Sequence, residues 1–86
     1  MKLTVQLFGH LRECNATPEI ALELPGIVTV ADFRLAFDAW ATAHWPAYSP
    51  GLLRAAAIAT ESTLLHADSL LPADGRLALL PPVSGG

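Results

Sequence analysis

The sequence predicts a small α+β domain in which one main helix packs on a mixed sheet of four to five strands. Apolar and polar residues alternate in two segments near the N-terminus and in one near the C-terminus, a pattern typical of half-buried strands. Between them lies one long segment with apolar residues at helical spacing. The 86 residues are enough for one domain of this kind.

The first strand is predicted at residues 2–8 and the second at residues 19–24, both with apolar residues at every second position. Residues 10–18 between them contain turn-forming residues and are predicted as a loop. The two strands therefore suit an antiparallel hairpin with a long connection. Phe8 departs from the alternation, because strand parity places this aromatic side chain on the polar face.

The main helix is predicted from about residue 30 to about residue 45. Thr29 is suited to cap its N-terminus, with Asp32 three residues later in a capping-box arrangement. Pro46 ends the helix, since the residue before a proline disfavours helical backbone. The stripe expected to pack on the sheet recurs at spacings of three and four residues and consists of Phe33, Phe37, Trp40 and His44.

Three further extended segments are predicted after the helix. An alanine-rich strand is expected at residues 53–59, a short strand or extended piece at 63–66, and the last strand at 76–80. The loop between the last two contains a candidate helical turn at residues 69–71. The resulting domain spans residues 1–80.

Composition argues against several classes of function. The net charge is −3 and the five basic residues are scattered, so we expect no nucleic-acid binding. No apolar stretch approaches the roughly 18 residues that span a bilayer, and no signal peptide is evident, so we expect a cytoplasmic protein that does not enter membranes. The single cysteine, Cys14, is interpreted as a small buried or half-buried hydrophobe. No metal site is predicted, because the spacing of the histidines in the sequence matches no metal site. They are His10, His44 and His66.

The sequence ends in a distinctive tail, residues 81–86, which reads Pro-Pro-Val-Ser-Gly-Gly. Two prolines hold the backbone extended and end the sheet. Six extended residues reach roughly 20 Å beyond the domain. Gly85 and Gly86 lack a Cβ and can pass through a narrow channel. We therefore expect a thin tip whose terminal carboxylate is the reactive group once another enzyme has activated it.

Both ends of the chain resemble a known family. The ending Pro-Pro-Val-Ser-Gly-Gly at residues 81–86 is similar to that of the small subunits of molybdopterin synthase, which are β-grasp (ubiquitin-like) sulfur carriers. Residues 7–13, Leu-Phe-Gly-His-Leu-Arg-Glu, resemble the first strand of that family and the turn after it. The order of the predicted elements and the chain length also agree with this family.

The resemblance implies a specific chemistry at Gly86. An adenylating enzyme similar to ubiquitin-activating enzymes would use ATP to convert the Gly86 carboxylate to an acyl-adenylate, and a sulfur donor would convert that to a thiocarboxylate. The large subunit of molybdopterin synthase would then receive the tail, and the sulfur would pass to a cyclic pterin precursor to form the molybdopterin dithiolene. The chain would carry sulfur covalently without a tightly bound cofactor, and would donate sulfur in a heterotetramer whose catalytic pocket lies on the large subunit.

A docking face follows from strand parity together with the resemblance. Phe8 and Leu80 both point outward, and the first and last strands of a β-grasp sheet are parallel neighbours, so the two side chains are expected to lie close together. Leu64 is expected to complete this apolar patch, and Arg12 matches an arginine of the family. The tail residues expected to contact the partner are Pro81, Pro82, Val83 and Ser84, ahead of Gly85 and Gly86.

Two alternatives use the same tail. A sister carrier would deliver sulfur to another product, such as the thiazole of thiamine or cysteine. A β-grasp interaction module or protein modifier would be conjugated through Gly86 or would bind without chemistry. The presence of only one lysine, Lys2, disfavours chains of conjugates.

Overall fold

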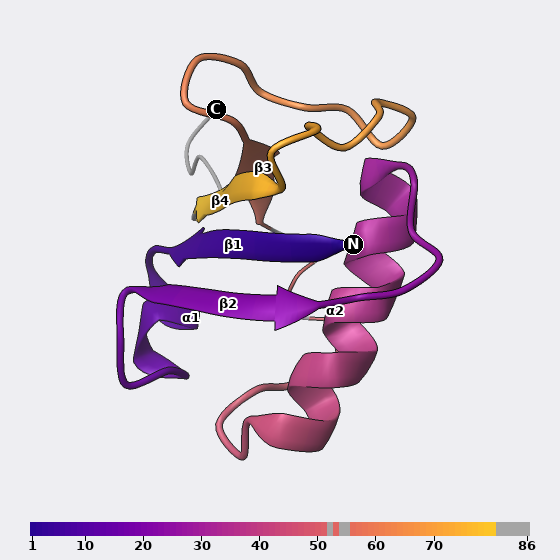
Figure 1. Ribbon diagram of the computed structural model, residues 1–86. Coiled ribbons are helices and arrows are strands. Elements are labelled where there is room, and N and C mark those ends of the chain that lie inside the picture. Colours follow the sequence, from indigo (N-terminus) through magenta and orange to yellow (C-terminus); the bar gives the residue numbers. More distant parts are fainter. Residues whose placement is uncertain (52, 54–55, 81–86) are drawn as a thin grey trace.

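The computed structural model describes residues 1–51, 53 and 56–80, and within them a four-stranded mixed sheet lies against one main helix (Figure 1). The spatial order of the strands is β2-β1-β4-β3. Their bounds are β1 Lys2–Leu7, β2 Glu19–Glu23, β3 Ala57–Ala59 and β4 Arg76–Leu80. The predicted α+β class is confirmed.

The two central strands are neighbours from opposite ends of the sequence. β1 pairs with β2 antiparallel, as the predicted hairpin requires, and with β4 in parallel, with Leu7 opposite Leu79. β3 pairs antiparallel with the other edge of β4. β1 ends one residue earlier than predicted, so Phe8 follows the strand instead of closing it.

The loop predicted at residues 10–18 contains a short helix, α1, at His10–Glu13, so that part of the prediction is wrong. The helix is a single turn in which the Arg12 N–H donates to Gly9 O at 3.1 Å. Its physical reason is tertiary: the turn buries Leu11, which is only 4% exposed, in the core. Local sequence pattern does not reveal so short a helix.

The main helix, α2, spans Val30–His44, and its predicted capping box is present. The Asp32 N–H donates to Thr29 Oγ1 at 3.2 Å, and Asp32 Oδ2 accepts from the N–H groups of Thr29 and Val28. These backbone hydrogen bonds lower the pKa of the Asp32 carboxyl. The last helical residue is His44, and the C-cap residue Trp45 directly precedes Pro46.

The face of α2 against the sheet differs from the prediction at one end. The buried residues are Val30, Phe33, Phe37 and Ala41. Trp40 is half-buried and stacks on His44 with ring centroids 4.7 Å apart, and His44 is exposed. His44 was therefore wrongly predicted to pack on the sheet, because the apolar stripe rotates onto Ala41 and Trp45 in the last turn.

The third strand is much shorter than predicted, since β3 begins only at Ala57. Leu53 is buried in a turn, and the backbone carbonyls of this turn already accept hydrogen bonds from groups outside the sheet. The Ala56 N–H donates to Leu53 O, and Arg34 Nη1 donates to the carbonyls of Leu53 at 2.8 Å and Ala56 at 3.0 Å. A carbonyl held by a guanidinium is less available for a strand ladder, so pairing starts after Ala56. Residues 52, 54 and 55 of the prediction lie outside the described residues.

The connection from β3 to β4 runs over the top of Figure 1. Isolated bridges and backbone hydrogen bonds hold it in place. The predicted extended piece at 63–66 forms an isolated bridge between Ala59 and Leu64. The helical turn predicted at 69–71 is wrong, because Leu70 forms a bridge with Thr29. That bridge ties the loop to the start of α2.

A polar cluster closes the loop after α2. Tyr48 donates its hydroxyl hydrogen to Asp38 Oδ1, and the Gly51 N–H donates to the same oxygen at 3.0 Å. The Leu53 N–H donates to the Tyr48 hydroxyl at 3.3 Å. Burial, and then the hydrogen bond to Asp38, raise the pKa of Tyr48, so the phenol remains protonated at neutral pH. This cluster holds the loop against α2.

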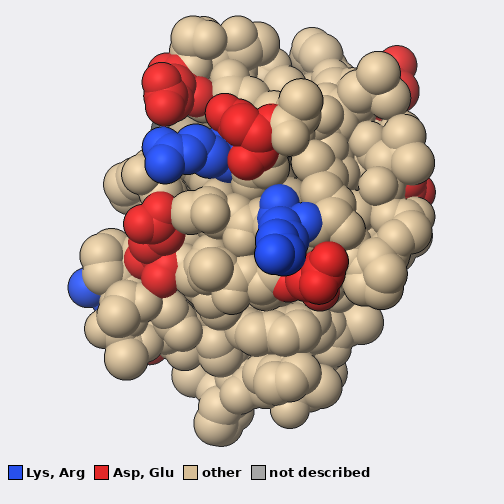
Figure 2. Space-filling model, in the orientation of Figure 1, with Lys and Arg blue, Asp and Glu red and all other residues tan. Residues whose placement is uncertain are grey.

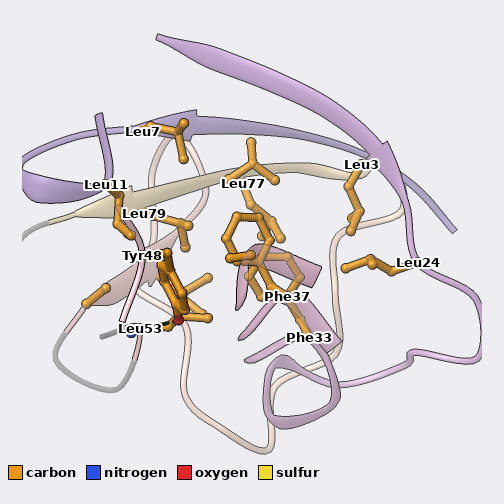
Figure 3. Close-up of a cluster of buried hydrophobic side chains, with 14 of the residues drawn as sticks. Leu3, Leu7, Leu11, Leu24, Phe33, Phe37, Tyr48, Leu53, Leu77 and Leu79 are labelled. Carbon is orange, nitrogen blue, oxygen red and sulfur yellow. Dashed lines mark hydrogen bonds between the residues drawn. The ribbon is translucent and has the colours of Figure 1, made fainter. Parts of the chain in front are cut away.

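The core lies between the inner face of the sheet and α2 (Figure 3). Phe33 and Phe37 from the helix meet Leu77 of β4 in the middle of the close-up, while Leu3 and Leu24 lie at one end. The other end is filled by the side chains of Leu7, Leu11, Tyr48, Leu53 and Leu79. With this face covered by the helix, the opposite face of the sheet is the one that can meet another molecule.

Candidate docking face and root of the tail

The last described residue of β4, Leu80, lies beside the end of β1. The two strands are parallel and Leu7 is in register with Leu79, so Phe8 and Leu80 occupy the next row and share the outward face. Phe8 is 43% exposed and Leu80 is half-buried. The carrier tail, residues 81–86, starts directly after Leu80. Its residues, including Gly85 and Gly86, lie outside the described part of the chain.

The next row crosses the whole outward face. Gln6 is in register with Ala78, Ala78 with Ala59, and Ala59 with Leu64. Residues directly opposite each other on paired strands point to the same side, so Leu64 belongs to this face and is 63% exposed. The pairings thus place Leu64 on the outward face, and the register of Leu7 with Leu79 leads on to Phe8 and Leu80, which follow these two residues in the chain.

Small side chains separate these larger ones. Ala57 is opposite Leu80, and Ala59 and Ala78 lie between Leu64 and Gln6. The apolar end of the outward face therefore consists of three large side chains around alanines. Strand parity already placed Ala78 on the face of Leu80, but sequence reasoning missed Ala57 and Ala59, because only the pairing of β3 with β4 shows that they face outward.

The opposite end of the outward face is polar. Lys2 is in register with Glu23, and Thr4 with both Ala21 and Arg76. In Figure 2, acidic and basic side chains lie next to one another over the sheet, and no single sign covers the visible face. The face therefore grades from charged residues at the start of β1 to apolar residues where the tail leaves.

A shallow depression lies between the two ends. It has a volume of about 70 Å³ and is lined by Thr4, Gln6, Glu19, Thr60, Glu61, Arg76, Leu77 and Ala78. A larger hollow of about 560 Å³ runs along α2 and is lined by Ala31, Arg34, Leu35, Asp38, Pro50, Gly51, Leu53 and Ala67. Among the described residues, none of those predicted for docking lines the larger hollow, so it is not counted in the candidate site.

Arg12 lies apart from the sheet face, on α1. Its side chain is exposed, and Nη1 donates to the backbone carbonyl of Asn15 at 3.3 Å. Arg12 is close to Phe8 only in sequence, because α1 begins two residues after Phe8.

Other reactive side chains are not gathered into a site. Within residues 1–51, 53 and 56–80, no three side chains of the metal-ligating types come together. His44 and His66 are exposed. No helix in this part of the chain has the length and apolar character needed to cross a membrane.

Cys14 is expected to react slowly with alkylating reagents in the folded protein. It is half-buried, and burial, followed by the nearby Glu13 carboxylate, raises the pKa of its thiol. The thiolate is the reactive form, so alkylation at pH 8 should be about threefold or more slower than in urea. Intact-mass measurement of iodoacetamide labelling provides the comparison. Labelling at the same rate in both conditions would contradict the prediction.

Comparison with known proteins agrees with the fold and the tail. The ThiS family matches residues 5–86, which is nearly the whole chain and includes the diglycine. Among solved structures, SAMP1 from Haloferax volcanii superposes with a TM-score of 0.66 at 27% sequence identity, and the match covers 100% of each chain. No curated protein matches the chain. Because the family model covers nearly the whole chain and the fold agrees with it, this chain belongs to the ThiS family of ubiquitin-like sulfur carriers.

Proposed function

We propose that this carrier is the small subunit of molybdopterin synthase. The observation that supports this most is the Pro-Pro-Val-Ser-Gly-Gly ending directly after β4, at the point where β1 presents Phe8. Carriers of the ThiS family work with adenylating enzymes of the E1 type and with sulfur-transfer partners. The pterin pathway is the finer assignment that we propose here.

The chemistry takes place at Gly86. Its carboxylate attacks the α-phosphorus of ATP on the adenylating enzyme, and pyrophosphate leaves. A sulfur donor then attacks the acyl-adenylate at its carbonyl carbon, and AMP leaves to give a thiocarboxylate. The sulfur of this group is ionised at neutral pH and is a stronger nucleophile than the original oxygen. In the synthase it attacks a carbon of the pterin precursor and displaces an oxygen leaving group, and hydrolysis of the resulting thioester leaves the sulfur on the pterin and returns the carboxylate of Gly86.

Docking and chemistry occupy different parts of the chain. The outward row of Phe8 and Leu80, with Leu64 beside it, supplies apolar area to the partner. The residues from Pro81 to Ser84 span the distance into the partner's pocket, and Arg12 also contacts the partner. Two carriers bind at the ends of a large-subunit dimer to form a heterotetramer.

The test is reconstitution with purified components. The chain is incubated with an adenylating enzyme from the same organism, ATP and a sulfur donor, and its intact mass is measured. We expect the mass gain of one oxygen replaced by sulfur. The loaded chain is then mixed with a large subunit and the cyclic pterin precursor, and formation of molybdopterin is followed. Loading without transfer to the pterin, but with transfer to a thiazole or cysteine precursor, would assign the sister pathway instead.

Replacing Phe8 by alanine is expected to weaken docking about tenfold or more, as for a central aromatic at an interface. Phe8 is exposed and not part of the core, so the thermal midpoint should change little. Leu35→Ala is the matched control, because Leu35 is 76% exposed but lies on α2. Titration calorimetry with the large subunit measures both variants. Equal affinities for the two would exclude Phe8 from the interface.

A further inference from the structure

The depression over Ala78 has no role in the proposed sulfur chemistry. The residues that line it indicate which kind of side chain a partner would place there. We infer that it receives a lysine or arginine side chain of the adenylating enzyme when that enzyme docks on Phe8 and Leu80. This inference rests on the proposed docking face and adds a charged contact that sets the orientation of the carrier. The evidence is the shape of the depression, its charge and its position.

The shape fits the end of one side chain. The lining includes the half-buried Ala78, whose side chain is a single methyl group, together with the longer side chains of Gln6, Glu19 and Glu61. A volume of about 70 Å³ is far below the roughly 300 Å³ or more of typical small-molecule sites. A cofactor or substrate does not fit here, whereas the tip of a long side chain does.

The charge of the lining favours a cation. Glu19 and Glu61 line the depression, and Asp74 lines an adjoining hollow together with Arg76 and Glu61. Arg76 is the one basic residue that lines either hollow within the described part of the chain. Within that part, the carboxylates of Glu19 and Glu61 have no ion-pair partner and accept no hydrogen bond. An added cation would therefore meet unpaired negative charge, while an anion would be repelled.

Both carboxylates are carried by fixed backbone. Glu19 is on β2, in register with Gln6. Glu61 lies in a turn in which the Thr60 N–H donates to Thr63 O at 2.9 Å and the Thr63 N–H donates to Thr60 Oγ1 at 3.2 Å. No loop has to be ordered before the carboxylates can bind a partner, which lowers the entropic cost of the contact.

The position links the depression to the apolar row. Ala78 precedes Leu80 by two residues on β4, and Gln6 precedes Phe8 by two residues on β1, so the depression and the row are adjacent on the same face. A lysine or arginine can lay its aliphatic stem over Ala78 and place its charged end near Glu19 or Glu61. A partner that covers the row is thus in reach of the depression.

The experiment measures the affinity of the carrier for the adenylating enzyme from the same organism, without ATP. We expect the double variant Glu19→Gln, Glu61→Gln to bind about fivefold more weakly, as for the loss of partly exposed ion pairs. Affinity of the unchanged carrier should also fall more steeply with added NaCl than that of the double variant. Arg76→Gln should bind equally well or more tightly, because it removes the competing cation.

Glu23→Gln is the matched control. Glu23 is also on β2 and points outward opposite Lys2, but it does not line the depression. If the double variant lowers the affinity no more than Glu23→Gln does, the inference is overturned. Glu19 and Glu61 would then contribute only through long-range electrostatic attraction. If Phe8→Ala weakens binding while the double variant does not, the docking face stands and the inference fails. If Phe8→Ala binds normally, the docking face itself fails. Thermal unfolding of each variant verifies that all are folded.

Discussion

Deleting Gly86 is expected to abolish sulfur loading while leaving the domain folded and able to dock. The deletion moves the terminal carboxylate back by about 3.5 Å, the length of one extended residue. In the proposed adenylation step this carboxylate must reach the α-phosphorus of ATP, and a misplacement of that size lowers a reaction rate by orders of magnitude. The residues proposed for docking, Phe8, Leu64 and Leu80, are unchanged, so the affinity for the partner should fall much less than the loading.

Intact-mass measurement after incubation with the adenylating enzyme, ATP and a sulfur donor gives the answer directly. Gly86→Ala is the informative companion, because it keeps the chain length and adds only a Cβ to the tip. Cys14→Ser is the control for the single thiol and should load normally. A mass gain that persists in the Gly86 deletion but disappears in Cys14→Ser would place the sulfur on the cysteine and contradict the proposed chemistry.

The Gly75→Ala variant is expected to lose about 3 kcal/mol of unfolding free energy, the largest effect on stability that the structure indicates. Gly75 has φ of +70°, in the left-handed region that disfavours side chains. A Cβ at this position would also lie 2.2 Å from the backbone oxygen of Lys2. Backbone cannot move aside as a flexible side chain can, and the Thr4 N–H donates to Gly75 O at 2.9 Å, which holds β1 and the start of β4 together.

Gly26→Ala separates the two causes. Gly26 has nearly the same backbone angle, with φ of +74°, but an added Cβ would meet nothing within 4 Å. It should therefore show the conformational penalty alone, about 1 kcal/mol. Urea unfolding of both variants, followed by tryptophan fluorescence, gives the difference. If Gly75→Ala and Gly26→Ala lost the same unfolding free energy, the predicted clash with the backbone oxygen of Lys2 would contribute nothing, and the prediction would be wrong.

Local chemistry explains which features of the fold can be predicted from sequence. The alternation in β1 and β4 indicates which residues face the core, and Thr29 with Asp32 marks the start of α2 within one turn. These signals depend on neighbours in the chain and need no tertiary contact. The exposed position of Phe8 follows from the same parity.

Predictions failed where a distant group competes for the backbone or the core. Arg34 binds the carbonyls of Leu53 and Ala56, which delays β3 until Ala57. Leu11 is buried by a one-turn helix that has little stability of its own. In both regions the secondary structure depends on contacts with residues far away in the sequence, and a local sequence pattern does not reveal such contacts.

The sequence by itself determined the two strands beside the start of the tail, because strand parity is read along the chain, and it is also the source of the proposal that Gly86 is the reactive group. Tertiary structure alone decided the shape of the outward face. Pairing of β3 with β4, and of Ala59 with Leu64, puts alanines between the larger apolar side chains. The same pairing brings Glu19 and Glu61, 42 positions apart in the numbering, to one depression. Cross-strand register is set by packing of the whole sheet, so no local segment encodes it.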